Sequence, residues 1–488
     1  MATTTFSEIP YDWLKPGVHI EVRPSYERAG LVAFPARALI IGQRLAAGAA
    51  AAGTLYQITR PAQGAGYFGA GSYADRMIRA WWANNKTSEL WAIALDDVGA
   101  GTAATGTITF TGAGAGTVPL YIDGTRIPVT IAAGNSVTQM AAAAVVAINA
   151  ETGLPVTAAS ALGVVTLTAK HKGAAGNQIP IKVAVLNDEA VPSGIGVAVA
   201  AMSAGATNPD VTDALDVIAA EWFTDIVVPW DDSANLLALS ADLTTRYAAM
   251  GKRDGHAYVG AAGTFGELST KGDVTNSPHI SLIGAKGSPS APWAWAAALG
   301  AVGTFQLTND PARQLRGLSL AGLMAPAPAD RFTDTEQNLL LGGGISTFNV
   351  LTDGTVTIDR VVTTYKESSL GVADRAWLDI MVPKTMTRIR YDWASYVTLL
   401  YPRHKLADDD TLAAESSDAV VTPRTMLGTW AARSKLYERQ AWIEATSETI
   451  EASSFWRSES DRNRLEGRQA VRIIGNLMVL AAALEFQV

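Results

Sequence analysis

Apolar and polar positions alternate with two different periods along most of this chain. Continuous apolar runs such as Ala38–Gly42 are typical of strands that are covered on both faces. Between such runs lie segments with apolar residues at helical spacing, for example Leu236–Met250, which predict amphipathic helices. Strands that alternate with helices form open, largely parallel sheets. We therefore expect a discontinuous central α/β domain built from residues 31–98 and 206–345.

The segment 99–205 interrupts this alternation and has a different composition, rich in Gly, Ala, Thr and Val and poor in charge. Ser136–Asn149 reads as a helix that begins at the Asn135–Ser136 pair, because these side chains favour the N-cap. Five other runs have the composition of strands: Thr107–Phe110, Leu120–Ile122, Ile127–Ile131, Val164–Thr168 and Ile179–Val183. We expect an inserted β-rich domain over 99–205.

A third region, 346–475, is denser in charge and mixes both periods, which predicts an α+β domain. Asp374–Leu400 reads as largely helical with an interruption near Pro383, and Thr449–Arg457 as a strand. Thr422 and Pro423 mark a helix start, since Thr is a favoured cap and Pro fits the first turn. Four basic residues are expected on the outer face of that helix: Arg424, Arg433, Lys435 and Arg439. This face is either a solvated helix surface or a contact for an acidic partner.

Near the N-terminus, a short strand candidate stands without a neighbouring partner. Its apolar residues Val18, Ile20 and Val22 alternate with polar ones, and prolines lie on both sides. Proline confines a strand to an edge or an extended segment. Residues 1–30 therefore hold either an edge strand or an extended N-terminal arm.

The last stretch, 476–488, has the same character. Leu484, Phe486 and Val488 alternate with Glu485 and Gln487, which is the period of a strand with one buried face. An unpaired strand must add to a sheet elsewhere or stand as an open edge. The residues before it also fit helical spacing, so periodicity alone leaves helix and strand open. A strand here would form a C-terminal arm that adds to a sheet of another subunit.

Composition and charge exclude several classes of protein. Hydrophobic residues make up 48% of the 488 residues and charged residues 17%, as in folded globular domains. A net charge of −8 argues against a general nucleic-acid binder. There is no cysteine, which excludes disulfides and thiol chemistry. We find neither a signal peptide nor an apolar run long enough for a membrane span, and expect a soluble protein made in a cytoplasm.

The candidate chemistry is weak. Gly64–Gly69 matches the dinucleotide-binding fingerprint, either as a phosphate site or, as we prefer, as loop and helix packing. The five histidines, among them His171 and His256, are scattered without ligand spacing. Asp408–Asp410 is either a cation site or a solvated acidic loop. We therefore expect no enzyme activity, no cofactor and no metal.

Several stretches resemble the Mu-like contractile tail sheath proteins. They include Lys15–Glu21, Ala38–Gln43, Pro292–Ala297, Asp310–Arg313 and Gly317–Leu320, and most strongly Asp353–Arg360, Thr363–Tyr365 and Tyr401–Leu406. The matching stretches occur in the family's order and span nearly the whole chain outside 99–205.

The resemblance implies a structural protein that forms homo-oligomeric sixfold rings, stacked into a helical sheath. Its partners would be a tail tube protein, baseplate proteins and tail-terminator proteins, without nucleic acid or membrane insertion. The two arms would add strands to neighbouring subunits, with Val18, Ile20 and Val22 in the first arm. In the second arm the residues are Leu480, Leu484, Phe486 and Val488. The resemblance, the lone strand candidate near the N-terminus and the lack of a catalytic site together favour a strand over Leu480–Val488, while Val471–Leu477 stays open to a helix. The basic helix after Thr422 is the candidate for tube contact.

The expected location is the tail sheath of a virion, assembled in the cytoplasm of a bacterial host. Contraction would drive the tube through a bacterial envelope without nucleotide hydrolysis. Two alternatives remain: a nucleotide-binding α/β enzyme that uses Gly64–Gly69, or the sheath subunit of a bacteriocin-like or secretion-type contractile injection machine.

Overall fold

The computed structural model describes residues 15–20 and 30–486 of the chain. It divides into two compact units. The smaller unit comprises Met1–Phe34 and Ile389–Arg472, and the larger unit comprises Pro35–Arg388 and Ile473–Val488. Val22 and Val488 lie outside the described residues. The five domains expected from the sequence stay a prediction.

The larger unit contains an eight-stranded sheet in the order β15-β14-β13-β12-β11-β1-β3-β2. Its strands are β1 Arg37–Gln43, β2 Tyr56–Ile58, β3 Glu89–Leu95, β11 Asp225–Val228, β12 His256–Ala262, β13 Ile280–Ala285, β14 Ile345–Val350 and β15 Val356–Arg360. Pairing is parallel from β3 to β14 and antiparallel at both edges. The apolar run Ala38–Ile41 is fully buried, as a strand covered on both faces should be. This confirms the predicted open, largely parallel sheet.

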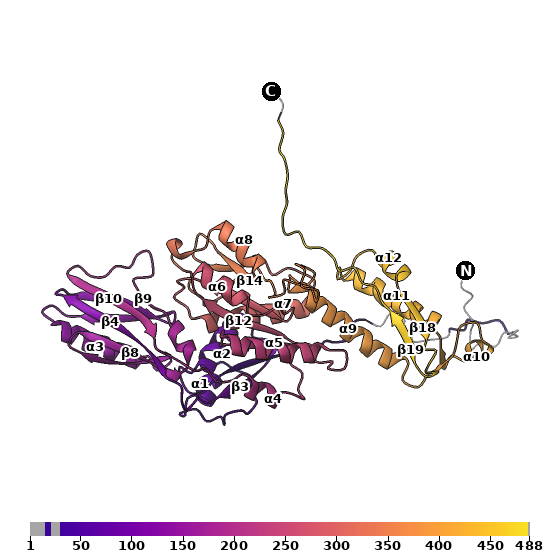
Figure 1. Cartoon of the computed structure of the whole chain (residues 1–488), viewed down its shortest axis with the longest axis horizontal. Coiled ribbons are helices and arrows are strands. Elements are labelled where there is room, and N and C mark those ends of the chain that lie inside the picture. The colour runs from indigo at the N-terminus through magenta and orange to yellow at the C-terminus, as the bar shows by residue number, and fades with distance from the viewer. Residues whose placement is uncertain (1–14, 21–29, 487–488) are drawn as a thin grey trace. The chain divides into compact units, whose positions relative to one another are not determined.

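Outside the segment 99–205, the larger unit also contains α-helices that lie between the strands of this sheet in the sequence (Figure 1). They are α1 Gln63–Phe68, α2 Tyr73–Asn84, α4 Thr212–Val217, α5 Ser233–Tyr247, α6 Phe265–Gly272, α7 Pro292–Asn309 and α8 Asp334–Gly342. Helix α7 is apolar on nearly every side and packs between α2 and strands β11 and β12. Among the described residues, no helix is both long and apolar enough to cross a membrane.

The segment predicted as an insert forms two further sheets and one helix (Figure 1). Its strands β4 Ala103–Gly112, β5 Gly116–Ile122, β6 Thr125–Ile131, β7 Val156–Ala161, β8 Val164–Lys172, β9 Ile181–Val183 and β10 Ile195–Ser203 pair in the orders β10-β4-β8-β7 and β6-β5-β9. The helix α3, Val137–Ala150, begins with a capping box between Ser136 and Gln139, as predicted from the cap. The sequence reading missed β7 and β10, whose alanine-rich composition resembles that of helices.

The smaller unit combines helices with short strand pairs. Its elements are the later part of α9 Met381–Leu400, then β16 Lys405–Leu406, α10 Leu412–Glu415, β17 Val420–Val421, α11 Pro423–Arg439, α12 Thr446–Glu451, β18 Ser454–Arg457 and β19 Leu465–Arg468. Thr422 caps α11 through the N–H of Thr425, which confirms the predicted helix start. The fold as a whole is mixed α/β.

Two predicted element boundaries in this part of the chain were wrong. Residues 374–380 are not helical, and α9 begins at Met381 with Pro383 in its first turn, where a missing N–H costs nothing. The predicted strand Thr449–Arg457 begins only at Ser454, because Thr446–Glu451 is helical.

Candidate functional site

The glycine-rich stretch Gly64–Gly69 does not form a nucleotide-binding loop. Gly64 and Gly66 lie inside helix α1, whereas the dinucleotide fingerprint needs its glycines between a parallel strand and a helix. The preceding strand β2 pairs antiparallel with β3. A Cβ atom at Gly64 would lie 2.9 Å from Oδ1 of the buried Asp75, a carboxylate that would repel phosphate. The glycines therefore serve helix packing.

The histidines make local structural contacts. His171 Nδ1 lies 2.8 Å from Asp97 Oδ1, and His256 Nε2 lies 2.9 Å from Ser281 Oγ. The ring of His279 packs on Tyr247, with centroids 4.4 Å apart. Within residues 15–20 and 30–486, no three His, Asp or Glu side chains are grouped so as to hold a metal ion.

Asp97 joins the central sheet to the insert. It follows β3 and accepts hydrogen bonds from His171 and from the backbone N–H of Lys172, both on β8. Burial by itself would raise the pKa of Asp97, but the hydrogen bonds from His171, Lys172 and Gln43 outweigh burial and lower this pKa. This is the behaviour of a structural ion-pair network.

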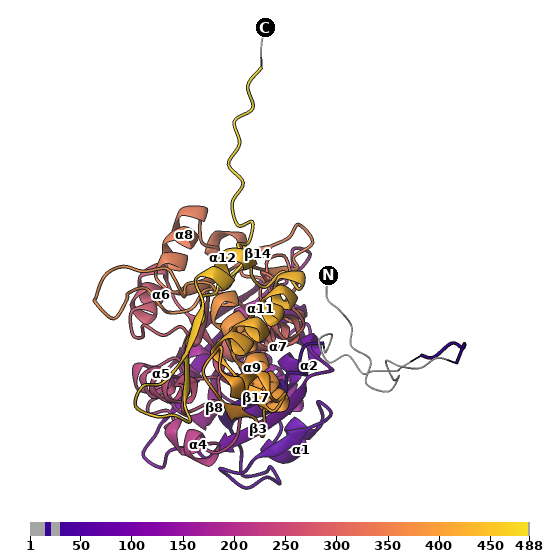
Figure 2. The ribbon, with the colours of Figure 1, turned by 90° about the vertical axis from the view of Figure 1, so that its right-hand side faces the viewer.

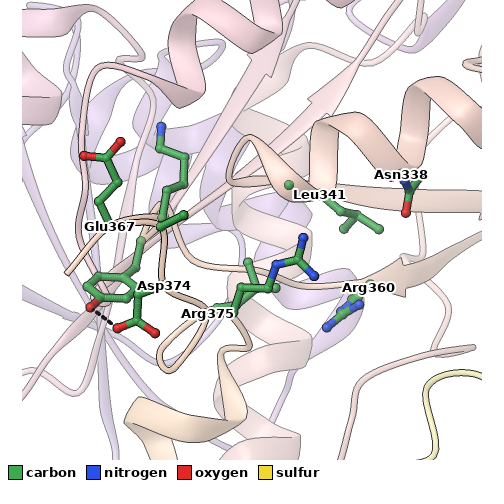
Figure 3. A pocket seen from close by; sticks show the side chains of 11 residues that line it. Asn338, Leu341, Arg360, Glu367, Asp374 and Arg375 are labelled. Carbon is green, nitrogen blue, oxygen red and sulfur yellow. Dashed lines mark hydrogen bonds between the residues drawn. The ribbon is translucent and has the colours of Figure 1, made fainter. Parts of the chain in front are cut away.

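A polar pocket of about 440 Å³ lies beside α8. Figure 3 labels six of the side chains that line it: Asn338, Leu341, Arg360, Glu367, Asp374 and Arg375. Arg360 donates two hydrogen bonds to Asp379, at 2.8 and 3.0 Å. Tyr365 donates one to Asp374 at 2.6 Å, which lowers the pKa of Asp374. The charges of Arg360 and Asp374 are engaged by these neighbours, so we assign the pocket no chemistry.

The acidic run Asp408–Asp410 is held by arginines. Asp410 accepts two hydrogen bonds from Arg424, at 2.9 and 3.0 Å, and these lower the pKa of Asp410. Asp408 accepts one from Arg457 at 2.9 Å. The run lies in a loop and forms ion pairs, which supports its interpretation as a solvated acidic loop.

Three of the four basic residues that were predicted on the outer face of α11 are exposed there. Arg424, Lys435 and Arg439 are exposed. Arg433 is buried, with 3% of its side chain exposed, and pairs with Asp392 of α9. At 100° per residue, Arg433 lies about 180° from Arg424 around the helix, on the side of the buried Trp430 and Tyr437. The prediction that Arg433 points outward was wrong. The angular position of Arg433 around the helix, opposite Arg424, would have indicated this from the sequence.

The pair between Arg433 and Asp392 is a feature that the sequence reading missed. Burial by itself would lower the pKa of Arg433, but the hydrogen bonds from Arg433 to Asp392 outweigh burial and raise this pKa. Burial and the same carboxylate raise the pKa of Tyr437. A charged residue on the apolar face of a predicted helix is the signal that would have indicated such a pair.

The described C-terminal residues, 474–486, form neither helix nor strand within this chain. Residues 474–486 extend as coil in both views (Figures 1 and 2), so the helix left open over Val471–Leu477 does not form. Asn476 is fixed to the larger unit, because its Nδ2 donates to Ala312 O at 2.9 Å and its Oδ1 accepts from Gln314 N at 3.2 Å. Beyond it, Leu480, Leu484 and Phe486 are 79%, 98% and 84% exposed.

The described part of the N-terminal arm is also exposed coil. Residues 15–20 contain no strand, and Val18 and Ile20 are 88% and 81% exposed. Val18 and Ile20 lie two residues apart, so in an extended chain their side chains share one face. The predicted strands in both arms need partners that a single chain does not contain, so they stay predictions.

Fold and site together define a class: a mixed α/β protein whose described segments 15–20 and 480–486 expose large apolar side chains. Residues 204–364 match the family model of the phage tail sheath protein central domain. The Mu-like prophage FluMu tail sheath protein of Haemophilus influenzae is 32% identical over 422 residues, which cover 86% of each chain.

Solved structures of sheath proteins are also similar. The sheath tail protein of Listeria innocua has 12% identity and a TM-score of 0.49, covering 92% of this chain and 93% of that one. A sheath complex of an extracellular contractile injection system, in its contracted state, has 9% identity and a TM-score of 0.47, covering 99% and 98%.

The identity to the prophage protein over most of both chains shows that this chain belongs to the phage tail sheath family. It is a structural subunit of the tail sheath of a phage-like particle.

Proposed function

We propose that copies of this chain assemble into stacked sixfold rings that form a contractile, helical sheath around a tail tube protein. Baseplate and tail-terminator proteins delimit the sheath at its ends. Assembly takes place in the cytoplasm of a bacterial host. The subunit works without catalysis, because contraction releases energy stored during assembly. Membership of the tail sheath family supports the proposal.

The observation that carries this proposal is the exposed C-terminal arm. Leu480, Leu484 and Phe486 share one face of an extended chain, because side chains alternate with period two. Each contributes about 1.5–3 kcal/mol when buried. Strand addition to a sheet of a neighbouring subunit buries this face and satisfies the free backbone groups. Hydrogen bonds from Gln314 and Arg316 to the carbonyls of Leu477 and Met478, both at 3.2 Å, fix the base of the arm.

The N-terminal arm would likewise add a strand to a neighbouring subunit. Val18 and Ile20 are exposed at the same spacing, and Val22 continues the pattern in the sequence. Main-chain hydrogen bonds between an added strand and its partner sheet persist while the linked units rotate as rigid bodies. Two such arms per subunit join neighbouring rings into a continuous mesh.

The tube contact involves the exposed basic residues of α11. Arg424, Lys435 and Arg439 lie within about 60° of one another around the helix. Arg424 is paired with Asp410. An acidic tube surface would therefore meet mainly Lys435 and Arg439, in contacts that break and reform in contraction. Arg433 is excluded from this proposal, since its guanidinium is buried against Asp392.

Electron microscopy of the purified protein tests the proposal. We expect tubes from the wild-type chain and from Glu485→Lys, whose change lies on the opposite face of the arm strand. Leu484→Asp combined with Phe486→Asp should abolish tubes and leave soluble monomers, as should deletion of 480–488. Tubes of normal length from these variants would refute the C-terminal arm.

The enzyme alternative has a separate test. We expect no rise in melting temperature with NAD or with ATP and Mg²⁺, because Gly64 and Gly66 lie inside helix α1 with the Asp75 carboxylate beside Gly64. A ligand at 100 times its Kd would stabilise the protein by about 2.7 kcal/mol. A rise in melting temperature that corresponds to this stabilisation and is lost in Gly64→Ala would support the hypothesis of a nucleotide-binding enzyme.

A further inference from the structure

A buried carboxylate in the smaller unit collects hydrogen bonds from two helices. Asp392 of α9 is 0% exposed. It accepts from Arg433 Nε at 3.1 Å and from Arg433 Nη2 at 2.6 and 2.5 Å. The hydroxyl of Tyr437 donates to it at 2.7 Å. A buried charge is stable only when it is paired and hydrogen-bonded in this way.

The same cluster holds the first described residues after the N-terminal arm, 30–34. The N–H of Val32 donates to Asp392 Oδ1 at 2.8 Å. Arg433 Nη1 donates to Gly30 O at 3.3 Å. The Phe34 ring meets the edge of Tyr391, with centroids 5.4 Å apart and an interplanar angle of 81°. These contacts fall at every second residue, the period of an extended chain.

We propose that Asp392 and Arg433 form a clamp that sets the register in which the N-terminal arm leaves the smaller unit, and that carries load between the arm and helices α9 and α11. This role rests on the proposed function of the arm in joining subunits. Asp392 is a positioning residue: it fixes the root of the arm and makes no contact with the partner.

Electrostatics explains why a charged clamp sets register better than an apolar contact. Successive residues of an extended chain direct their N–H and C=O groups to opposite sides. A slip by one residue would turn a carbonyl oxygen toward the carboxylate, which is repulsive in a buried site. A slip by two residues would restore the backbone polarity and move the Phe34 ring away from Tyr391. The native register alone satisfies all three contacts.

The clamp also gives the arm a defined path for load. Residues 30–34 bind side chains of α9 and α11, and Asp392 and Arg433 are 41 positions apart in the chain. Tension on the arm therefore acts on two helices at once, through hydrogen bonds that must break together. An arm that transmits motion between rings needs such a rigid base.

The test compares matched Asp→Asn variants of the full-length chain. Asp392→Asn removes the buried charge, and the control Asp410→Asn removes the exposed partner of Arg424. Hydrogen exchange of unassembled protein reports on residues 30–34, and electron microscopy reports on assembly. In Asp392→Asn we expect exchange at 30–34 to accelerate about tenfold or more and tubes to become rare or short. Asp410→Asn should match the wild type in both measurements.

Tyr437→Phe covers the case in which Asp392→Asn unfolds the smaller unit. It removes one hydrogen bond to Asp392 and keeps the ion pair. We expect exchange at 30–34 to rise about threefold or more, with protection of 423–439 retained. Unchanged exchange at 30–34 in both folded variants, or normal tubes from a folded Asp392→Asn protein, would overturn the proposal.

A chain that begins at Gly30 separates failure of the clamp from failure of the proposed function. If this truncated chain forms tubes as well as the full chain, the N-terminal arm does not join subunits and the proposed function is wrong on that point. If truncation abolishes tubes while Asp392→Asn assembles normally, the arm stands and the clamp is wrong.

Discussion

At the residue scale, the buried ionisable side chains are held by specific partners. His256 is 2% exposed on β12 and lies beside Ser281, the Tyr258 ring, Lys384 and His279. Burial, followed by the nearby positive charges, lowers the pKa of His256 well below its usual value. The folded protein therefore keeps this ring neutral at pH values where the unfolded chain, with a pKa of about 6.5, binds a proton.

This gives a pH dependence with a defined sign. Because the unfolded state binds more protons below pH 6.5, the free energy of unfolding should fall as pH decreases from there, by at most about 1.4 kcal/mol per pH unit. Above pH 6.5 the contribution is fully present. Urea titrations at pH 5.0 and 7.5 should show a smaller pH difference for His256→Gln than for the wild type. Equal differences would mean that His256 is protonated in the folded state.

At the element scale, helix α7 lies close to the sheet because a glycine stands on each side of the contact, Gly260 on β12 and Gly300 on α7. A Cβ atom at Gly260 of β12 would come within 1.9 Å of the carbonyl oxygen of Pro292. One at Gly300 of α7 would lie 2.7 Å from Val227. Both glycines allow the backbones to approach, which is a common use of glycine at helix–sheet contacts.

Gly260→Ala should therefore destabilise the protein by about 3 kcal/mol or more, since backbone atoms must move to admit the methyl group. Gly266→Ala, in α6 with no atom near its Cβ position, is the control. We expect this control to be neutral or stabilising by up to about 1 kcal/mol. Urea unfolding measures both, and a small cost for Gly260→Ala would show that α7 shifts freely on the sheet.

At the scale of the whole molecule, the two units have separate apolar cores. The large core cluster runs from Ala38 to Met381 and belongs to the larger unit. The smaller unit buries its own aromatic residues, including Trp430, Tyr437 and Trp442. Separate cores allow separate unfolding.

Calorimetry of the unassembled protein should resolve two transitions. Trp430→Ala removes a side chain that is 1% exposed and should cost the smaller unit about 3–5 kcal/mol, which lowers one transition and leaves the other unchanged. Trp293→Ala, in the larger unit, should shift only the other transition. If either variant moves both transitions together, the units unfold as one.

Features that depend on local interactions could be predicted from the sequence alone. The apolar runs of the central sheet, the cap at Ser136 and the Thr422–Pro423 helix start follow from contacts within a few residues of each other. The resemblance to tail sheath proteins was also readable, because it rests on short stretches that are kept in order. The apolar residues Val18, Ile20, Leu484 and Phe486, which are exposed in the structure, were visible in the sequence as alternating residues with no partner strand nearby in the chain.

Contacts between distant segments follow only from the three-dimensional fold. It set the strand order of the eight-stranded sheet, turned Arg433 inward to Asp392, and brought Val32 to a carboxylate 360 positions away. Periodicity reports which face of an element is apolar, and it carries no information about the partner of that face. The physical reason is that pairing across such separations depends on the joint packing of all the elements between, which no local pattern encodes.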